Sequence, residues 1–312
     1  MQREEQGRPT ELGRIKRMLA LRTFDGWADM PAARLAVLAE HSKAKFFSKG
    51  TYLFREGRPV TRMHMIVDGE VELRRHGHLL RKLGSRGAAG ALSMFARDPH
   101  GYDGIALRDT TTLEMELEDT EDIFEDNFDI LHTVLRATAA DVIQIRRSMD
   151  AGAGFGEDFK DGIACPTRPM DLVERIFFLR KSMVVAQGRI NAIADMARLA
   201  REVRLEAGEV LWKSGEPSKE IVVLACGKLA CVSDDGRQRF RFGTGDTVGG
   251  LDALAGIPRW YEAVAEEKVV GLALDMEGVV DVWEDHVELP MELMRRLAGF
   301  LLELLERSSH TA

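Results

Sequence analysis

The sequence has few cysteines and no long apolar run. Its 312 residues include three cysteines, an odd number that is too small for a disulfide framework. We therefore expect Cys165, Cys226 and Cys231 to be small buried residues in a reducing compartment. A strained hairpin pair of Cys226 and Cys231, or half of a metal site, is the alternative. No stretch approaches the roughly 18 apolar residues that span a membrane, and the first residues lack the apolar core of a signal peptide. These absences predict a cytoplasmic protein that does not enter a membrane.

Positive charge and catalytic motifs are also scarce. Lysine and arginine number 43 against 51 acidic residues, so the formal net charge is −8. Because affinity for nucleic acid depends on basic side chains that neutralise phosphates, we expect no nucleic-acid partner. The eight histidines have no metal-ligand spacing, and no nucleophile–base pair or phosphate loop of the Walker type occurs. The sequence therefore predicts a protein that is not an enzyme and holds no metal.

An internal duplication organises the residues that are present. The stretch "LFREGRPV" at residues 53–60 aligns with "LWKSGEPS" at 211–218, which lies 158 positions later, and aligned glycines continue this register. After one inserted residue in a predicted hairpin turn the offset becomes 159, and "DIFED" at 122–126 aligns with "DVWED" at 281–285. The two copies together cover nearly the whole chain.

Each copy repeats the same order of elements. A helical stretch comes first, then short alternating runs such as "MHMIVDGEVEL" and "EIVVLACGKLACV", which are typical of antiparallel strands, and then a final helix. Glycines, prolines and charges replace the periodic apolar residues at 150–169. We predict an α+β protein with domains at 13–149 and 170–308 and a linker at 150–169. Each domain is predicted to be an antiparallel β-roll of jelly-roll type with flanking N- and C-terminal helices.

The repeat unit resembles the cyclic-nucleotide-binding domain family, which includes catabolite-activator-like regulators and protein kinase A regulatory subunits. The resemblance is carried by "SKGTYLFREG" with "MIVDGEVEL" in the first copy and by "EAGEVLWKSG" with "VVLACGKLACV" in the second. It implies a phosphate-binding cassette. In this family a glycine and the N-terminus of a short helix approach the cyclic phosphate, a glutamate binds the ribose hydroxyl, and an arginine pairs with the phosphate.

Both cassettes depart from the family pattern. Gly250 and Ala91 stand where the family has the glutamate, and His100 replaces the arginine that the second copy keeps as Arg259. Loss of a hydrogen bond to a charged group costs roughly 1.5–3 kcal/mol, or about ten- to a hundred-fold in affinity. We therefore predict two degenerate pockets. Their candidate residues are Gly90, Ala91, Leu92, His100, Tyr102 and Asp103 in the first copy and Gly249, Gly250, Leu251, Asp252, Pro258, Arg259, Trp260, Tyr261 and Glu262 in the second.

Three side chains of these pockets have a specific expected role. We expect Arg259 to be structural and to be held by Asp252 or Glu262, with an anion ligand as the alternative. Tyr102 and Tyr261 occupy the same place in the two copies, and we expect them to fill the pockets rather than to stack on a nucleotide base.

The last helix and two basic hairpins bear on partners. A wide apolar stripe on the last helix predicts that the two final helices pack together or that the chain forms a homo-oligomer. The stripe consists of Leu293, Met294, Leu297, Phe300, Leu301, Leu304 and Leu305. The hairpins at 74–82 and 237–242 are expected to be solvated, with a partner-binding ridge as the alternative. No DNA-reading helix-turn-helix is expected after Arg307.

These observations predict a cytoplasmic, non-enzymatic regulatory or scaffold protein that acts through protein–protein contacts and takes no cofactor. The alternative is a small-molecule receptor that binds a cyclic nucleotide, a cyclic dinucleotide or another anion through the second domain.

Overall fold

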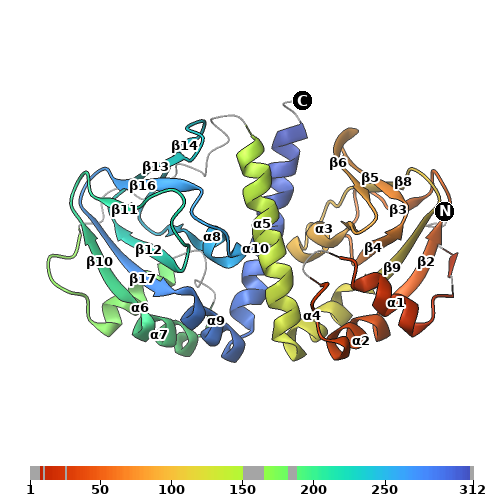
Figure 1. Ribbon diagram of the computed structural model, residues 1–312, viewed down its shortest axis with the longest axis horizontal. Helices are drawn as coiled ribbons and strands as arrows, with labels where there is room; N and C mark the ends of the chain where they lie inside the picture. The colour runs from red at the N-terminus through yellow and green to blue at the C-terminus, as the bar shows by residue number, and fades with distance from the viewer. Residues whose placement is uncertain (1–7, 10, 25–26, 150–164, 182–187, 310–312) are drawn as a thin grey trace. The chain divides into compact units, whose positions relative to one another are not determined.

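The described residues form four antiparallel sheets of short strands (Figure 1). The structure is a computed structural model, and it describes the chain except residues 1–7, 10, 25–26, 150–164, 182–187 and 310–312. Strands β13 (Leu229–Ser233) and β16 (Tyr261–Ala265) bury every second side chain. Because successive side chains of a strand point to opposite faces, this pattern places one face of the sheet on a core.

In the first copy the two sheets have the strand orders β1-β2-β9-β4-β7 and β3-β8-β5-β6. The strands are β1 (Arg8–Pro9), β2 (Lys43–Phe47), β3 (Tyr52–Phe54), β4 (Arg62–Asp68), β5 (Glu70–Arg75), β6 (His78–Gly84), β7 (Ala88–Ala89), β8 (Asp103–Ala106) and β9 (Thr110–Glu116). A buried apolar cluster that includes Ile66, Val71 and Tyr102 packs inside this roll.

The second copy repeats this topology, with the orders β10-β17-β12-β15 and β11-β16-β13-β14. Its other strands are β10 (Arg201–Leu205), β11 (Val210–Trp212), β12 (Glu220–Cys226), β14 (Arg239–Phe242), β15 (Thr247–Val248) and β17 (Val269–Asp275). Only β1 has no counterpart among the described strands. The duplication read from the sequence is therefore a duplication of the fold, and the predicted α+β class with two β-rolls and flanking helices is confirmed.

Helices precede and follow each roll, and one short helix, α3 in the first copy and α8 in the second, lies between two strands of the roll. They are α1 (Arg14–Leu21), α2 (Ala32–Glu40), α3 (Ala91–Ala96), α4 (Leu117–Asp126), α5 (Phe128–Ser148), α6 (Leu172–Lys181), α7 (Ile190–Leu199), α8 (Gly250–Ala255), α9 (Met276–Asp285) and α10 (Glu288–Ser309). Helix α9 begins with a side-chain cap, in which Asp275 accepts a hydrogen bond from the Glu277 amide at 2.9 Å. None of the helices in the described part of the chain has the length and apolarity to cross a membrane.

The contacts divide the chain into two units that differ from the two copies. Unit 1 comprises Met1–Thr138 with Met294–Ala312, and unit 2 comprises Ala139–Leu293. The dividing points lie inside α5 and α10, so each unit includes the second part of the other copy's final helix. The domain boundaries predicted from the sequence remain predictions. Most of the predicted linker, residues 150–164, lies outside the described residues.

A disulfide joins Cys165 to Cys226, which is the last residue of β12. The expectation that all three cysteines are unpaired is therefore wrong, and so is the alternative pairing across the hairpin, because Cys231 is the free cysteine. Cys226 and Cys231 are nevertheless buried strand residues, as expected. Cys165 and Cys226 are 61 positions apart, and spacing in the sequence cannot reveal that two such residues meet.

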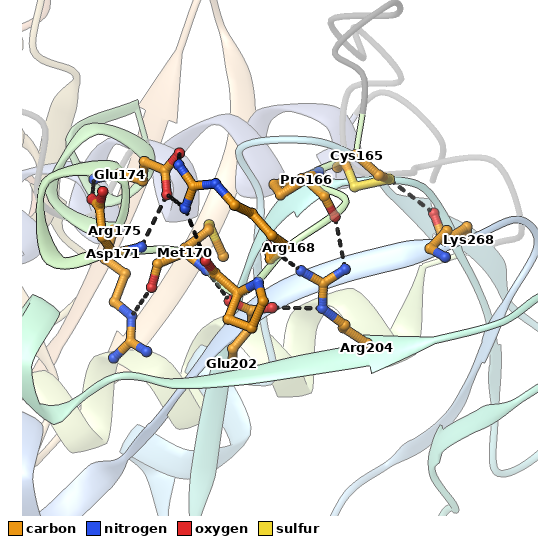
Figure 2. Close-up of polar contacts among 12 residues, drawn as sticks. Cys165, Pro166, Arg168, Met170, Asp171, Glu174, Arg175, Glu202, Arg204 and Lys268 are labelled. Atoms are coloured by element: carbon orange, nitrogen blue, oxygen red, sulfur yellow. Dashed lines mark hydrogen bonds and ion pairs between the residues drawn. A yellow bond between two sulfur atoms is a disulfide. The ribbon is translucent and has the colours of Figure 1, made fainter.

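Hydrogen bonds hold the segment after Cys165 against β10 (Figure 2). Arg204 donates to the carbonyl oxygens of Pro166 and Arg168, at 2.7 and 2.6 Å, and to the Glu202 carboxylate at 2.6 Å. Glu202 in turn accepts a bond from the Met170 amide at 2.7 Å. The disulfide and these bonds together fix the start of the second copy's helical stretch.

We expect reduction of the disulfide to lower the free energy of unfolding of unit 2 by about 4 kcal/mol, because the unfolded chain regains the entropy of a long closed loop. Urea unfolding with and without a dithiol reductant measures this loss. The Cys165→Ala variant should have the reduced stability and should not respond to the reductant. Equal stability of the oxidised and reduced protein would contradict this prediction.

Candidate functional site

A glycine with a left-handed backbone begins the short helix of each cassette. Gly90 precedes α3 with φ 91°, and Gly249 precedes α8 with φ 73°. Glycine is favoured there because other residues rarely adopt this conformation. A β-carbon at Gly249 would also overlap the Arg259 guanidinium and the Trp212 ring. Both short helices thus begin at the glycine that the sequence pattern predicts there.

A tyrosine hydroxyl lies at the N-terminus of each short helix. The Tyr261 hydroxyl accepts a hydrogen bond from the Gly249 amide at 3.0 Å, and the Tyr102 hydroxyl is hydrogen-bonded to the backbone of Gly90 and Ser93. Both tyrosines are almost fully buried. Burial raises the pKa of both phenols, so both hydroxyls are neutral at neutral pH. These hydroxyls occupy the amide donors that the family pattern offers to a cyclic phosphate.

The arginine of the second cassette points into the protein. The Arg259 guanidinium donates to the Gly249 carbonyl at 3.0 Å and to the Glu220 carbonyl, and its Nη1 lies 3.4 Å from the Asp252 carboxylate. It also lies over the Trp212 ring at 3.9 Å, and the residue is only 3% exposed. Backbone oxygens and one carboxylate thus surround a charge that the family pattern directs to a ligand.

Glu262 takes no part in this arrangement. It lies on β16 next to Tyr261, and neighbouring strand residues point to opposite faces. Because Tyr261 faces the core, the Glu262 side chain faces away from it. Of the two partners expected for Arg259, the structure places Asp252 beside it.

Aromatic rings fill the space around the second cassette. The Trp260 indole donates to Asp252 at 3.1 Å and stacks on Phe240, with 5.3 Å between ring centroids. Burial raises the pKa of Asp252, while Arg259 and the indole hydrogen bond act in the opposite direction. The cluster consists of Trp212, Phe240, Phe242, Trp260 and Tyr261.

The first cassette keeps the backbone contacts of the second without its arginine. The carbonyl of His100 accepts a bond from the Gly57 amide at 2.6 Å, as the Arg259 carbonyl does from the Gly215 amide at 2.8 Å. The His100 side chain is exposed. Asp103 accepts a hydrogen bond from the Glu56 amide at 2.9 Å and so stabilises the loop that follows β3.

The remaining candidate residues bring no polar side chain to either cassette. Ala91 and Gly250, at the two glutamate positions, are half-buried and bring no hydrogen-bonding side chain. Leu92 and Leu251 pack against the cores of their own copies, and Pro258 is exposed.

Two arginines near the cassettes were not predicted as site residues. Arg75 is 12% exposed, pairs with Asp98 and donates to the Gly101 carbonyl at 2.9 Å. The prediction of a solvated hairpin at 74–82 is therefore wrong for this residue. Arg146 lies over the Phe240 ring at 4.8 Å, and burial lowers its pKa to about 9. Sequence signals for burial are absent, because both side chains are charged and lie in polar stretches.

Comparison with known families identifies the class of protein that these rolls and cassettes define. The model of the cyclic nucleotide-binding domain matches residues 44–127 and 202–286, which together make up more than half of the chain. The chain belongs to the cyclic nucleotide-binding domain family, and it carries two such domains in tandem.

Two proteins that resemble this chain do so at low identity. The lysophospholipase NTE1 of Cryptococcus neoformans var. neoformans serotype D is 22% identical over 281 residues, which cover 84% of this chain. The match covers only 17% of that protein, so this chain spans about a sixth of its length. The cAMP complex of the regulatory domain of Toxoplasma gondii PKA is 15% identical and has a TM-score of 0.35, with 93% of this chain and 98% of that chain covered.

A bacterial structure covers less than half of this chain. The N-terminal domain of a transcriptional regulator from Streptomyces coelicolor A3(2) is 24% identical and has a TM-score of 0.37, with 43% of this chain and 97% of that chain covered. TM-scores of this size do not define a fold by themselves, so the family assignment rests on the two matched segments.

Proposed function

We propose that the protein is a non-enzymatic regulatory or scaffold protein whose two nucleotide pockets are occupied by its own side chains. The observation that carries this proposal is the tyrosine hydroxyl on the backbone amides of each short helix. A protein of this kind acts through contacts with protein partners rather than by sensing a nucleotide. The missing glutamate and the inward-facing Arg259 support the same function.

Displacement of the tyrosine opposes nucleotide binding. A nucleotide in the second pocket would have to expose a buried ring, which costs about 1.5–3 kcal/mol, and to break a hydrogen bond worth about 1 kcal/mol. The ribose contact that is lost with the glutamate adds roughly 1.5–3 kcal/mol. Together these costs correspond to an affinity lower by about three to five orders of magnitude than that of an open pocket with a complete cassette.

The second candidate function is a receptor for a cyclic nucleotide, a cyclic dinucleotide or another anion through the second domain. It is favoured by Arg259, which keeps the positive charge of the cassette, and by the left-handed Gly249. For this function the guanidinium would have to leave Asp252 and the two carbonyl oxygens that now hold it.

We expect isothermal titration calorimetry of the full chain to detect no sub-micromolar binding of cyclic AMP, cyclic GMP or cyclic di-GMP. A thermal-shift assay gives an independent measure, because a ligand at a hundred times its dissociation constant stabilises the native state by about 2.7 kcal/mol.

The Arg259→Gln variant separates the two functions, with Glu262→Gln as a control at an acid that faces away from the pocket. A sub-micromolar site that is lost in Arg259→Gln and kept in Glu262→Gln would establish the receptor and refute the proposed function. Equal absence of binding in all three proteins is the expected result.

A further inference from the structure

In unit 1 the last part of α10 packs on the roll of the first copy. Leu302 is 5% exposed and belongs to the apolar cluster of Ile66 and Tyr102. One helical turn later, Glu306 forms an ion pair with Arg75, the last residue of β5. An apolar anchor and an acidic side chain thus fix this helix on the roll.

In unit 2 the last part of α5 packs on the roll of the second copy in the same way. Ile143 is buried in the cluster of Phe240 and Tyr261. One turn later, Arg147 donates to both carboxylate oxygens of Asp234, at 2.9 and 2.8 Å. Asp234 directly follows the last residue of β13. Here the anchor is again apolar, but the helix brings the positive charge.

The two arrangements are equivalent in position and opposite in charge. At the repeat offset of 159, Ile143 aligns with Leu302, and Arg147 aligns with Glu306. Arg75 and Asp234 lie at the same end of the equivalent strands β5 and β13. Each roll therefore attracts the final helix of the other copy. The helix of its own copy would bring like charges together.

We propose that these charge-reversed pairs determine which helix each roll accepts. The apolar anchors cannot discriminate, because isoleucine and leucine bury similar surfaces in both places. Charge can discriminate, because a pairing of like with like would set Arg147 against Arg75 or Glu306 against Asp234. The partner that each surface fits is thus the final helix of the complementary copy. Two chains in which a roll of one receives the final helix of the same copy from the other would bring like charges together, so this pairing is disfavoured. The inference does not depend on what the pockets bind.

Substitutions on the helices test this rule in the full chain. Arg147→Glu gives the first helix the residue that the second carries there, and Glu306→Arg does the reverse. We expect calorimetry to show a melting temperature about 2–4 °C lower for Arg147→Glu than for the neutral Arg147→Ala. The difference between Glu306→Arg and Glu306→Gln should reach about 4–8 °C, because Arg75 is nearly buried. Adding Asp234→Arg to Arg147→Glu should recover most of the loss.

Glu303→Arg is the matched control, since it makes the same charge change on α10 at a side chain that is 63% exposed and whose ion-pair partner, Arg307, is 56% exposed. Its melting temperature should stay within about 1 °C of the wild type. Salt at about 1 M should reduce the difference between Arg147→Glu and Arg147→Ala. The proposal is overturned if the reversed variants are no less stable than the neutral ones, or if Asp234→Arg recovers nothing. If Glu306→Arg does not fold, the Arg147 series decides alone.

Discussion

Replacement of Leu297 and Leu301 by aspartate should unfold unit 1 and leave the strands of unit 2 protected. Both leucines belong to the part of α10 that lies in unit 1, and they are 7% and 1% exposed. Each buried leucine contributes about 1.5–3 kcal/mol, and two unpaired carboxylates add a burial cost, so we expect a loss of at least about 6 kcal/mol. Domains have only about 5–15 kcal/mol of stability.

Hydrogen exchange followed by mass spectrometry measures this outcome strand by strand. Strand β4 should lose its protection, while β12 should keep it. The matched control replaces Ile15 and Leu19 by aspartate, because these residues have the same spacing on α1 and are 73% and 60% exposed. The opposite result would be expected if α10 packed on the roll that it follows in the sequence. Loss of protection in β12 with an intact β4 would therefore contradict the packing of α10 on the roll of the first copy.

Acid should destabilise unit 1 through a single histidine. His64 lies on β4, is 3% exposed, and is hydrogen-bonded through Nδ1 to the Thr112 hydroxyl at 3.2 Å. Burial, together with the positive charges of Lys45 and Arg62, lowers the pKa of His64 to about 3. Glu114 lies 4.0 Å from Nε2 and is the acidic group that faces the ring. The native state therefore keeps this imidazole neutral where an unfolded histidine is already charged.

The direction of the pH dependence follows from this lowered pKa. The unfolded chain binds the proton first, near pH 6.5, so the contribution of His64 is complete above that pH and is lost progressively down to about pH 3. One pKa unit corresponds to about 1.4 kcal/mol, which gives a loss of about 3 kcal/mol at pH 4 and about 4–5 kcal/mol in total.

Urea unfolding at pH 7, 6, 5 and 4 measures this dependence, with the His64→Gln variant as a side chain that does not titrate. We expect the stability of the wild type to fall more steeply with acid than that of the variant. Equal slopes in the two proteins would show that the pKa of His64 is the same in the native and unfolded states, and would contradict the prediction. The second copy has Val222 in place of His64, so unit 2 should not show this loss.

Several features of the molecule follow from local sequence patterns. Alternating apolar residues and aligned glycines recur in two copies. The strands form where this alternation predicts them, and many of the aligned glycines have a positive φ. Strand formation and tight turns depend on neighbouring residues, so one sequence is enough to predict them. The absent glutamates and the single remaining cassette arginine can be read in the same way, because the family pattern assigns a role to each position.

Other features depend on contacts between residues far apart in the chain. Cys165 and Cys226 are separated by 61 positions, and the burial of Arg75 depends on Asp98 and on Glu306 at the other end of the chain. Tyr261 could be predicted to fill a pocket, but the position of its hydroxyl on the Gly249 amide required the folded loop.

The sequence by itself determined the duplication, the β-roll class and the incomplete cassettes, since each depends on residue types at short spacing. Only the tertiary structure decided which roll each final helix covers. Both helices have an apolar stripe that could bury against either roll, so hydrophobic periodicity is the same for both choices. The charges that distinguish the choices, Arg147 with Asp234 and Glu306 with Arg75, pair across 87 and 231 positions. No local pattern contains that information.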